Sequence, residues 1–235
     1  LMAASYNEKR QEKSFKLFEI GAIHNQSTKS ATGSNEKFHL GLLWYGDVTP
    51  HWRKYEERDA FRSKGEVAHI LKSIGIGNIS FKLSKENGLR TSMKIYSGKT
   101  QIGNMGIPEP EVLKAYDLNL SPAVCDLSIH IMRDIWKNKK TEYRSLVPFP
   151  SMKRDIALQV SCDVPAADLM DTIWKQGGST LNHVLLFDVY QSEDVGETKK
   201  SLAFSLKFQS ETSTLTDSEV DQNVGKILNS IKQIH

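Results

Sequence analysis

The sequence predicts an α+β fold in two domains, and three observations lead to this prediction. Several short runs alternate apolar and polar residues, which is the pattern of strands with one buried face. Other stretches repeat apolar residues at helical intervals, which is the pattern of helices packed on a sheet. Residues 143–150, YRSLVPFP, separate two groups of such elements. Because proline ends a helix and favours an extended backbone, we divide the chain into residues 1–142 and 143–235.

The composition is that of an ordinary soluble domain. Of the 235 residues, 39% are hydrophobic and 25% are charged, which is the usual range for globular proteins. No apolar run is long enough to span a membrane, and the first residues, LMAASYNEKRQEK, lack the pattern of a signal peptide. We therefore expect no membrane partner and a cytoplasmic location. Since the first residue is not Met, we also expect the chain to be a piece of a longer one.

The charge is distributed unevenly along the chain. The net charge of the whole chain is only +3, but residues 148–235 hold 8 Lys and Arg against 12 Asp and Glu, a net charge of −4. The net charge of the other residues is therefore +7. If the second domain binds nucleic acid, we expect it to use a local basic edge and not a general positive field.

The second domain shows the order β-α-β-β-α. Strands are expected at residues 154–160, 181–190 and 202–208. Pro165 is expected to open the first helix, which Gly177 and Gly178 end, and a capping box at Thr216-Asp-Ser-Glu219 is expected to open the second. These are five of the six elements of the ferredoxin-like split βαβ fold. The closing edge strand is missing, and we expect it to have been cut off or to belong to a disordered tail.

The first domain has a less regular pattern. We expect strands at residues 15–23, 38–45, 89–95 and 100–105, and helices at residues 64–74, 111–116 and 127–139. A turn at Ser97-Gly98 joins the last two strands, so the sheet is largely antiparallel. Gly103-Asn-Met-Gly106 resembles a phosphate loop but lacks the further glycines and the lysine that such a loop needs, so we interpret it as a hairpin or bulge.

The sequence contains no recognisable catalytic or metal-binding motif. Cys125 and Cys162 lie far apart without C-x-x-C spacing, which argues against a disulfide framework or thiolate zinc site and fits a reducing compartment. None of the seven histidines forms H-E-x-x-H, and His130, five residues after Cys125, is better interpreted as a core histidine. Asp155 and Asp188 lie on strands that might bring them together, but such carboxylates usually bind nearby backbone or cations. We expect no catalytic residue and no bound metal.

Residues 185–204, LLFDVYQSEDVGETKKSLAF, allow two interpretations. An apolar run ends in Asp188 and Tyr190, and Lys199 and Lys200 follow across a polar loop. In an ordinary hairpin, the aspartate belongs to the turn, the tyrosine packs, and the lysines keep the hairpin soluble. In a binding edge, the same four side chains contact a ligand.

Three stretches, FPSMKRDIALQV, LLFDVYQSEDVGETKKSLAFSLKF and TLTDSEV, resemble the anticodon-binding domain of bacterial phenylalanyl-tRNA synthetase beta subunits. The family pattern is a proline before an Arg-Asp strand, then F-D-x-Y, K-S-L-A and T-L-T-D-x-E-V, and this sequence keeps each of them. The first domain is similar to the preceding domain of the same subunit, at LFEIG (residues 17–21), Asp59 to Lys64-Gly65, and IGNMG (residues 102–106).

The resemblance implies a fold and partners. The first domain would be a class II synthetase-like antiparallel sheet without a working active site, packed on the catalytic alpha subunit. The whole enzyme would be a tetramer in which this alpha–beta pair joins a second one. It would attach phenylalanine to its tRNA with ATP and magnesium, while this fragment holds no cofactor of its own.

The resemblance also implies the site residues. Tyr190 of F-D-x-Y would stack on the first anticodon base, and Asp188 would accept from the donor edge of guanine. Ser201 of K-S-L-A and the small Ala157 complete the set that the family implies. Arg154 and Lys200 are added from charge and position as phosphate partners. The alternative function is a stand-alone ferredoxin-like regulatory or small-ligand-binding module. Such a module usually needs a glycine-rich loop at its interface, and this sequence has no such loop where it is required.

Overall fold

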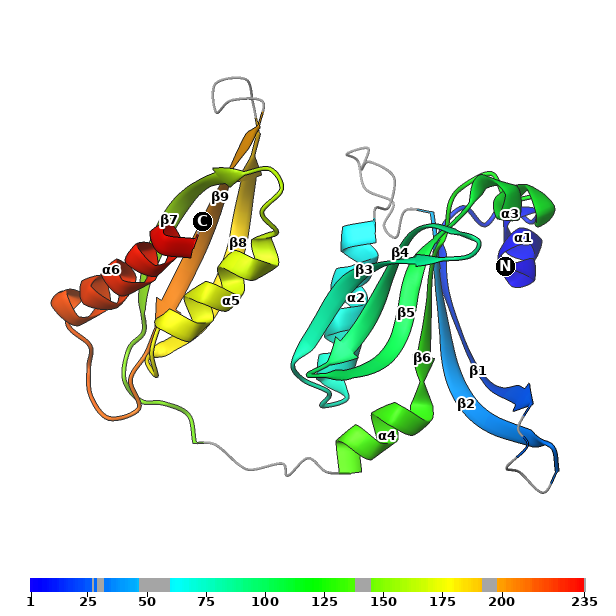
Figure 1. Cartoon of the computed structure of the whole chain (residues 1–235), viewed down its shortest axis with the longest axis horizontal. Helices are drawn as coiled ribbons and strands as arrows, with labels where there is room; N and C mark the ends of the chain where they lie inside the picture. Colours follow the sequence, from blue (N-terminus) through cyan, green and yellow to red (C-terminus); the bar gives the residue numbers. More distant parts are fainter. Residues whose placement is uncertain (27, 29–31, 47–59, 138–144, 192–197, 235) are drawn as a thin grey trace. The chain divides into compact units, whose positions relative to one another are not determined.

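The computed structural model describes residues 1–26, 28, 32–46, 60–137, 145–191 and 198–234. It forms two compact units, Leu1–Thr141 and Glu142–His235. Each unit is built around its own sheet (Figure 1). The predicted α+β class is confirmed.

The first unit contains a six-stranded sheet with the order β1-β2-β6-β5-β4-β3. Every neighbouring pair is antiparallel. The strands are β1 (Phe15–Gln26), β2 (Ser34–Tyr45), β3 (Ile79–Glu86), β4 (Leu89–Ser97), β5 (Thr100–Pro108) and β6 (Ala123–Ser128). The predicted largely antiparallel sheet is therefore confirmed.

Helices of the first unit lie on both faces of this sheet. They are α1 (Met2–Glu8), α2 (Ala60–Ser73), α3 (Pro110–Ala115) and α4 (Ile129–Lys137). On one face, Val67 and Leu71 of α2 and Met132 of α4 belong to the same buried cluster as Ile95 and Leu127. On the other face, Ala4 of α1 belongs to a smaller cluster with Leu43, Tyr45 and Leu118.

The helix predicted at residues 127–139 was wrong at its start. Leu127 and Ser128 belong to β6, and α4 begins only at Ile129. Because β6 is only six residues long and continues directly into α4, the boundary between the strand and the helix is hard to place from the residue pattern alone. The predicted end of the helix, at residues 138–139, lies outside the described residues. The prediction also missed α1 and β3.

The glycine-containing stretch Gly103–Gly106 is part of a strand. It lies within β5, and the pairing with β4 shifts its register between Ile95 and Tyr96. A Cβ atom at Gly103 would overlap the carbonyl oxygen of Asp126 on β6. The glycine therefore permits close backbone approach inside the sheet, and the stretch forms no phosphate loop.

The second unit is a ferredoxin-like domain. Its elements are β7 (Met152–Ser161), α5 (Ala166–Gln176), β8 (Leu181–Tyr190), β9 (Lys199–Phe208) and α6 (Asp217–Ile234). The sheet order is β7-β9-β8, so the third strand lies between the first two and is antiparallel to both. This is the split βαβ arrangement predicted from the sequence. Within the described residues, no strand pairs with the outer edge of β7.

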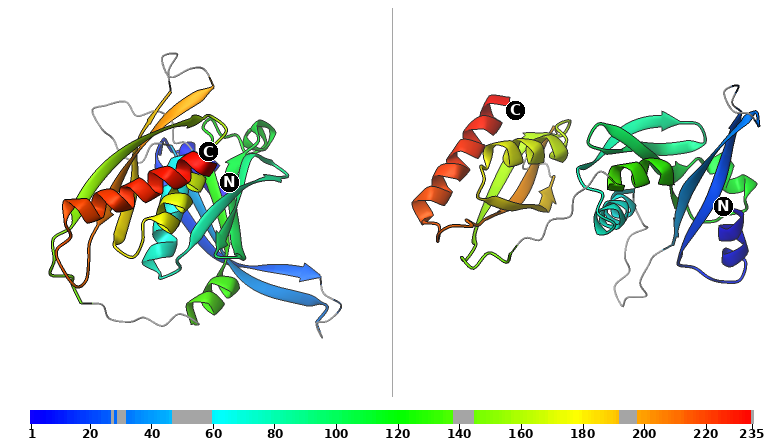
Figure 2. Two further views of the ribbon diagram at one scale, coloured as in Figure 1. Left: turned by 60° about the vertical axis from the view of Figure 1, so that its left-hand side comes forward. Right: turned by 90° about the horizontal axis from the view of Figure 1, so that it is seen from below.

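Both helices of the second unit cover the same face of its sheet (Figure 2). Leu169 and Ile173 of α5 and Val220 and Ile227 of α6 are fully buried against the strands. The strands contribute nine buried residues to this core: Ile156, Leu158, Val160, Leu181, Val184, Leu202, Phe204, Leu206 and Phe208. The opposite face of the sheet is left without a covering helix.

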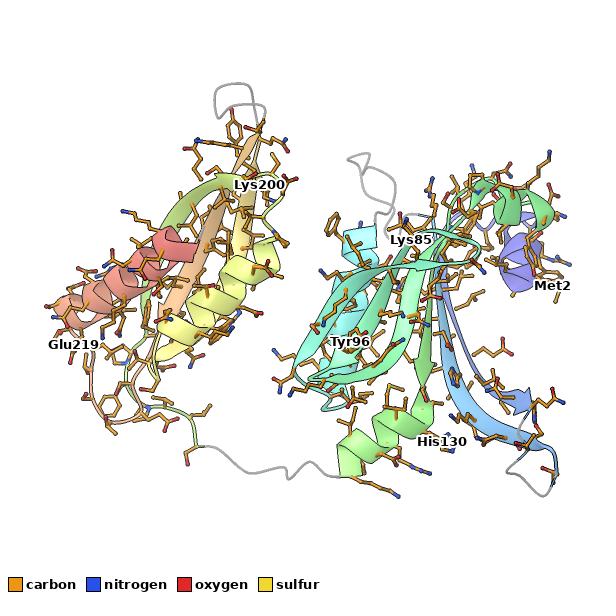
Figure 3. All side chains as sticks on the ribbon, viewed as in Figure 1. Met2, Lys85, Tyr96, His130, Lys200 and Glu219 are labelled. Carbon is orange, nitrogen blue, oxygen red and sulfur yellow. The ribbon has the colours of Figure 1, made fainter. Side chains whose placement is uncertain are left out.

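The ends of the two helices follow local sequence chemistry. At the start of α6, the predicted capping box is present: the Thr216 N–H and hydroxyl each donate to Glu219 Oε2 at 2.8 Å, and the Glu219 N–H donates to Thr216 Oγ1 at 3.4 Å. Glu219 is labelled at this end of the helix in Figure 3. Pro165 is the N-cap of α5 and not its first helical residue, a one-position difference from the prediction.

Candidate nucleic-acid interface

The uncovered face of the three-stranded sheet, here called the open face, is organised in cross-strand rows. Residues directly opposite on antiparallel strands share one face of the sheet, and successive rows are two residues apart. The open face consists of Lys153, Asp155, Ala157, Gln159 and Ser161 of β7, of Lys199, Ser201, Ala203, Ser205 and Lys207 of β9, and of His183, Leu185, Asp188 and Tyr190 of β8.

Two neighbouring rows hold the four residues that the family pattern implied. One row is Gln159–Ser201–Tyr190, and the next is Ala157–Ala203–Asp188. The Tyr190 residue is 50% exposed. An aromatic ring, a hydroxyl, a carboxylate and two methyl groups therefore occupy adjacent positions on one surface. Such a set can stack on a flat base and accept or donate hydrogen bonds at its edge.

A β-bulge in β8 turns Asp188 and Tyr190 toward the open face. Leu186 pairs with Phe204 on the helix-covered side, and the register then shifts so that Asp188 pairs with Ala203. Without the shift, regular alternation from Leu186 would place the aspartate and the tyrosine on the helix-covered side. Bulges commonly re-aim side chains in this way next to binding sites.

Arg154 and Lys200 lie on the helix-covered side and are bound by protein groups. Arg154 Nε donates to Asp221 Oδ1 at 2.9 Å, and its NH2 group donates to Asp217 Oδ1. Hydrogen bonds to Asp217 and then to Asp221 raise the pKa of the Arg154 guanidinium. Lys200 Nζ donates to the carbonyl oxygen of Cys162 at 2.8 Å. The structure therefore does not bring these two cations to the row of Tyr190.

Sequence reasoning missed Gln159 and Ala203, which lie on the open face between or beside the residues it named. Gln159 is in the row of Tyr190, and Ala203 separates Ala157 from Asp188. The alternation of β7 and β9 would have identified both, because every second residue of a regular strand faces the same side.

The remaining candidates for chemistry do not form a site. Asp155 and Asp188 are on the two outer strands with β9 between them, which separates them by two strand spacings, about 10 Å. His130 Nδ1 accepts from the Phe38 backbone N–H at 3.4 Å (Figure 3), and burial raises the pKa of the Cys125 thiol. Across the described part of the chain, no three His, Cys, Asp or Glu side chains gather to hold a metal ion. None of the described helices is long and apolar enough to cross a membrane.

The first unit has a different kind of surface, a groove between β1, β2 and α2. We call it the β1–β2 groove; its volume is about 910 Å³. The Phe18 and Ile20 residues on its β1 side are 75% and 59% exposed. At one end, Glu66 Oε2 accepts from Lys16 Nζ at 2.6 Å and from Trp44 Nε1 at 2.7 Å. A largely apolar floor with a small polar end suits a protein partner better than a polar ligand.

An α+β chain that ends in a ferredoxin-like sheet with one open, aromatic-bearing face has the architecture of a single-stranded RNA-binding protein. Two family models match it. The phenylalanyl tRNA synthetase beta chain CLM domain matches residues 1–129, and the ferredoxin-fold anticodon binding domain matches residues 148–235. The chain belongs to the phenylalanyl-tRNA synthetase beta chain family.

Curated relatives agree with these family matches. The chain is 32% identical over 235 residues to a phenylalanine–tRNA ligase beta subunit of Carboxydothermus hydrogenoformans, covering 97% of this chain and 29% of that one. It is 33% identical over 224 residues to the beta subunit of Staphylococcus aureus, covering 94% and 28%. The chain thus spans less than a third of the length of these relatives. Among solved structures, pyrrolysyl-tRNA synthetase from Desulfitobacterium hafniense matches with a TM-score of 0.46 and 15% identity, over 62% of this chain and 51% of that one.

Proposed function

We propose that this chain is the part of a phenylalanine–tRNA ligase beta subunit that binds the anticodon of phenylalanine tRNA through the open face of its second unit. The observation that carries the proposal is the adjacency of the rows Gln159–Ser201–Tyr190 and Ala157–Ala203–Asp188. Unpaired anticodon bases can be splayed onto such a surface, whereas paired bases cannot.

Each side chain has a distinct role in this proposal. The ring of Tyr190 stacks on the first anticodon base, an interaction worth about 1–3 kcal/mol per base. The Asp188 carboxylate accepts from the donor edge of a guanine, and the Ser201 hydroxyl donates or accepts beside it. Ala157 and Ala203 keep the surface shallow, so that a base can approach the sheet.

The whole enzyme supplies the chemistry in this proposal. The catalytic alpha subunit would use ATP and magnesium to join phenylalanine to its tRNA, in a tetramer of two alpha–beta pairs in the cytoplasm. This chain contributes binding surfaces in this proposal, and among its described residues no three His, Cys, Asp or Glu side chains gather to hold a metal ion. The alternative of a stand-alone regulatory or small-ligand module is not supported by the family matches, which cover both units.

The first unit provides the contact with the alpha subunit in this proposal. The β1–β2 groove presents Phe18 and Ile20 as large exposed side chains at the edge of the six-stranded sheet. Exposed apolar surface of this kind typically marks a protein interface. We assign the groove to the catalytic subunit because its largely apolar floor suits a protein partner.

The anticodon proposal is tested by titrating the 235-residue chain with an anticodon stem-loop of phenylalanine tRNA at fixed salt. Tyr190→Ala is expected to weaken binding by about 1–3 kcal/mol, and Tyr190→Phe to retain most of it, because the ring does the stacking. Tyr116→Ala, at a partly exposed tyrosine of the first unit, is the control. Equal affinity of the native chain and Tyr190→Ala would refute the role of Tyr190.

A further inference from the structure

A row of basic side chains lies at the other end of the open face. Lys153, Lys207 and His183 stand directly opposite one another on β7, β9 and β8. We call them the basic row. Lys153 and His183 are exposed, and Lys207 is partly exposed. Three nitrogen-bearing side chains therefore share one line across the sheet, perpendicular to its strands.

Nothing in the described parts of the chain neutralises the basic row. No hydrogen bond or ion pair of the three side chains with another described residue is present. The nearest acidic residue of the open face, Asp155, is one row away on β7, and Asp188 is two rows away on β8. Like charges directly opposite on neighbouring strands are destabilising, so the two lysines repel each other unless an anion lies between them.

The arrangement contrasts with that of two other cations of the second unit, Arg154 and Lys200. Residues 148–235 have a net charge of −4, and Arg154 and Lys200 are bound by protein oxygens on the opposite side. The lysines of the basic row thus form a local concentration of positive charge on an otherwise acidic domain. Such a site attracts an anion through its own nearby positive charges, because the net charge of the whole domain is negative.

We propose that the basic row binds backbone phosphates of the same RNA strand whose bases lie on the Tyr190 end of the open face. This inference rests on the proposed anticodon function. Ser201 and Lys207 are six residues apart on β9, which is about 20 Å along a strand, a span that a few unstacked nucleotides can cover. Lysines act as point charges for phosphate, and the His183 imidazole can donate one further N–H.

Continuity with the base platform favours RNA over an acidic peptide. Both features lie on one face of one sheet, with only the row Asp155–Ser205–Leu185 between the basic row and the row of Asp188. In a single-stranded RNA complex, stacking platforms and a positive track for the backbone occur together. The phosphate contacts would set the direction of the strand without reading its sequence.

The test compares the salt dependence of stem-loop binding for the native 235-residue chain and the double variant Lys153→Gln/Lys207→Gln. Each lost phosphate contact is expected to reduce the slope of log affinity against log salt by about 0.7. The reduction should be the same for a stem-loop with a scrambled loop, since phosphates carry no sequence information. Lys175→Gln/Lys226→Gln, on the exposed surfaces of α5 and α6, is the charge-matched control and should leave the slope close to native.

The outcomes separate this inference from the proposed function. If the double variant shows a smaller salt dependence and Tyr190→Ala binds the stem-loop more weakly, both the basic row and the proposed anticodon function are supported. An unchanged slope with an effect of Tyr190→Ala overturns the basic row and leaves the base platform standing. A reduced slope with no effect of Tyr190→Ala supports the row and overturns the platform. If the native chain binds neither RNA, both are overturned.

Discussion

The six-stranded and the three-stranded sheets expose different kinds of surface. In the first unit, α2 and α4 pack on one face and α1 packs on the other, and the exposed Phe18 and Ile20 line the β1–β2 groove. In the second unit, α5 and α6 pack on one face. Most positions of the open face are polar; the exceptions are Leu185, Tyr190 and the alanines, and Phe187 at the bulge of β8 is also exposed. The sheet covered on one side therefore provides the largely polar face that we assign to RNA, and the sheet covered on both sides provides the edge groove that we assign to a protein partner.

The largest effect on stability is expected from a substitution that disrupts the core of the second unit and leaves the cores of the first unit intact. Phe204 is completely buried in the core of the second unit, so Phe204→Ala should lower the free energy of unfolding by about 3–5 kcal/mol. Urea unfolding followed by a probe in each unit would show the second unit destabilised and the first unchanged, because their cores contain no common residue. Ser205→Ala, on the open face of the same strand, should change stability by less than about 0.5 kcal/mol. An equal loss of unfolding free energy in both units would contradict the conclusion that the two units have separate cores.

The second largest effect is expected on the affinity for the alpha subunit, when the apolar side chains of the β1–β2 groove are replaced. Phe18→Glu/Ile20→Glu should weaken association with the alpha subunit by about 2–4 kcal/mol, because it places charges where a central apolar contact is expected. Affinity is measured by titrating the purified alpha subunit with the chain, and stem-loop binding is measured in parallel. The matched control is Leu83→Glu, since Leu83 is 84% exposed on β3 at the opposite edge of the sheet. If the control weakens association as much as the double variant, the docking surface is not the groove.

The contrast between the units also explains how much the sequence could predict. In the second unit, alternation and the capping box at Thr216 gave the right elements, because each strand has one buried and one open face. In the first unit, β6 was not recognised, because it has only six residues and α4 begins immediately after it, so its last residues were assigned to the helix. The alternation of apolar and polar residues identifies a strand only where one face of that strand is buried and the other is exposed.

The open face was only partly predictable for a related reason. The motif F-D-x-Y pointed to Asp188 and Tyr190, but their orientation depends on the register shift in β8, which only pairing with β9 reveals. Arg154 and Lys200 were chosen by charge, and strand parity places them on the other side, where Asp217, Asp221 and the Cys162 carbonyl bind them. Lys153 and Lys207 have the opposite parity and lie on the open face, and strand pairing, not charge alone, identifies them.

A smaller effect is expected at the start of α6. Thr216→Ala removes the hydroxyl that accepts from the Glu219 N–H and donates to its carboxylate, and the loss of such a cap costs about 1 kcal/mol. The destabilisation should be confined to the second unit in the two-probe urea experiment. Thr216→Ser keeps the hydroxyl and should remain close to native. A loss of the same size in Thr216→Ser would show that the methyl group and not the cap is responsible.

The smallest effect is a pH dependence that distinguishes the two units. The Thr216 N–H and then its hydroxyl hold the pKa of the Glu219 carboxyl below its ordinary value. A carboxyl whose pKa is lower in the folded state stabilises that state above its unfolded pKa, about 4.3, and loses this contribution as the pH falls through the folded pKa. The difference in unfolding free energy between the native chain and Glu219→Gln should therefore shrink as the pH is lowered from neutrality through this range. The same measurement on Glu111→Gln, in α3 of the first unit, should leave the second unit unaffected. A native-minus-variant difference that stays constant with pH would mean that the capping contact contributes no proton linkage.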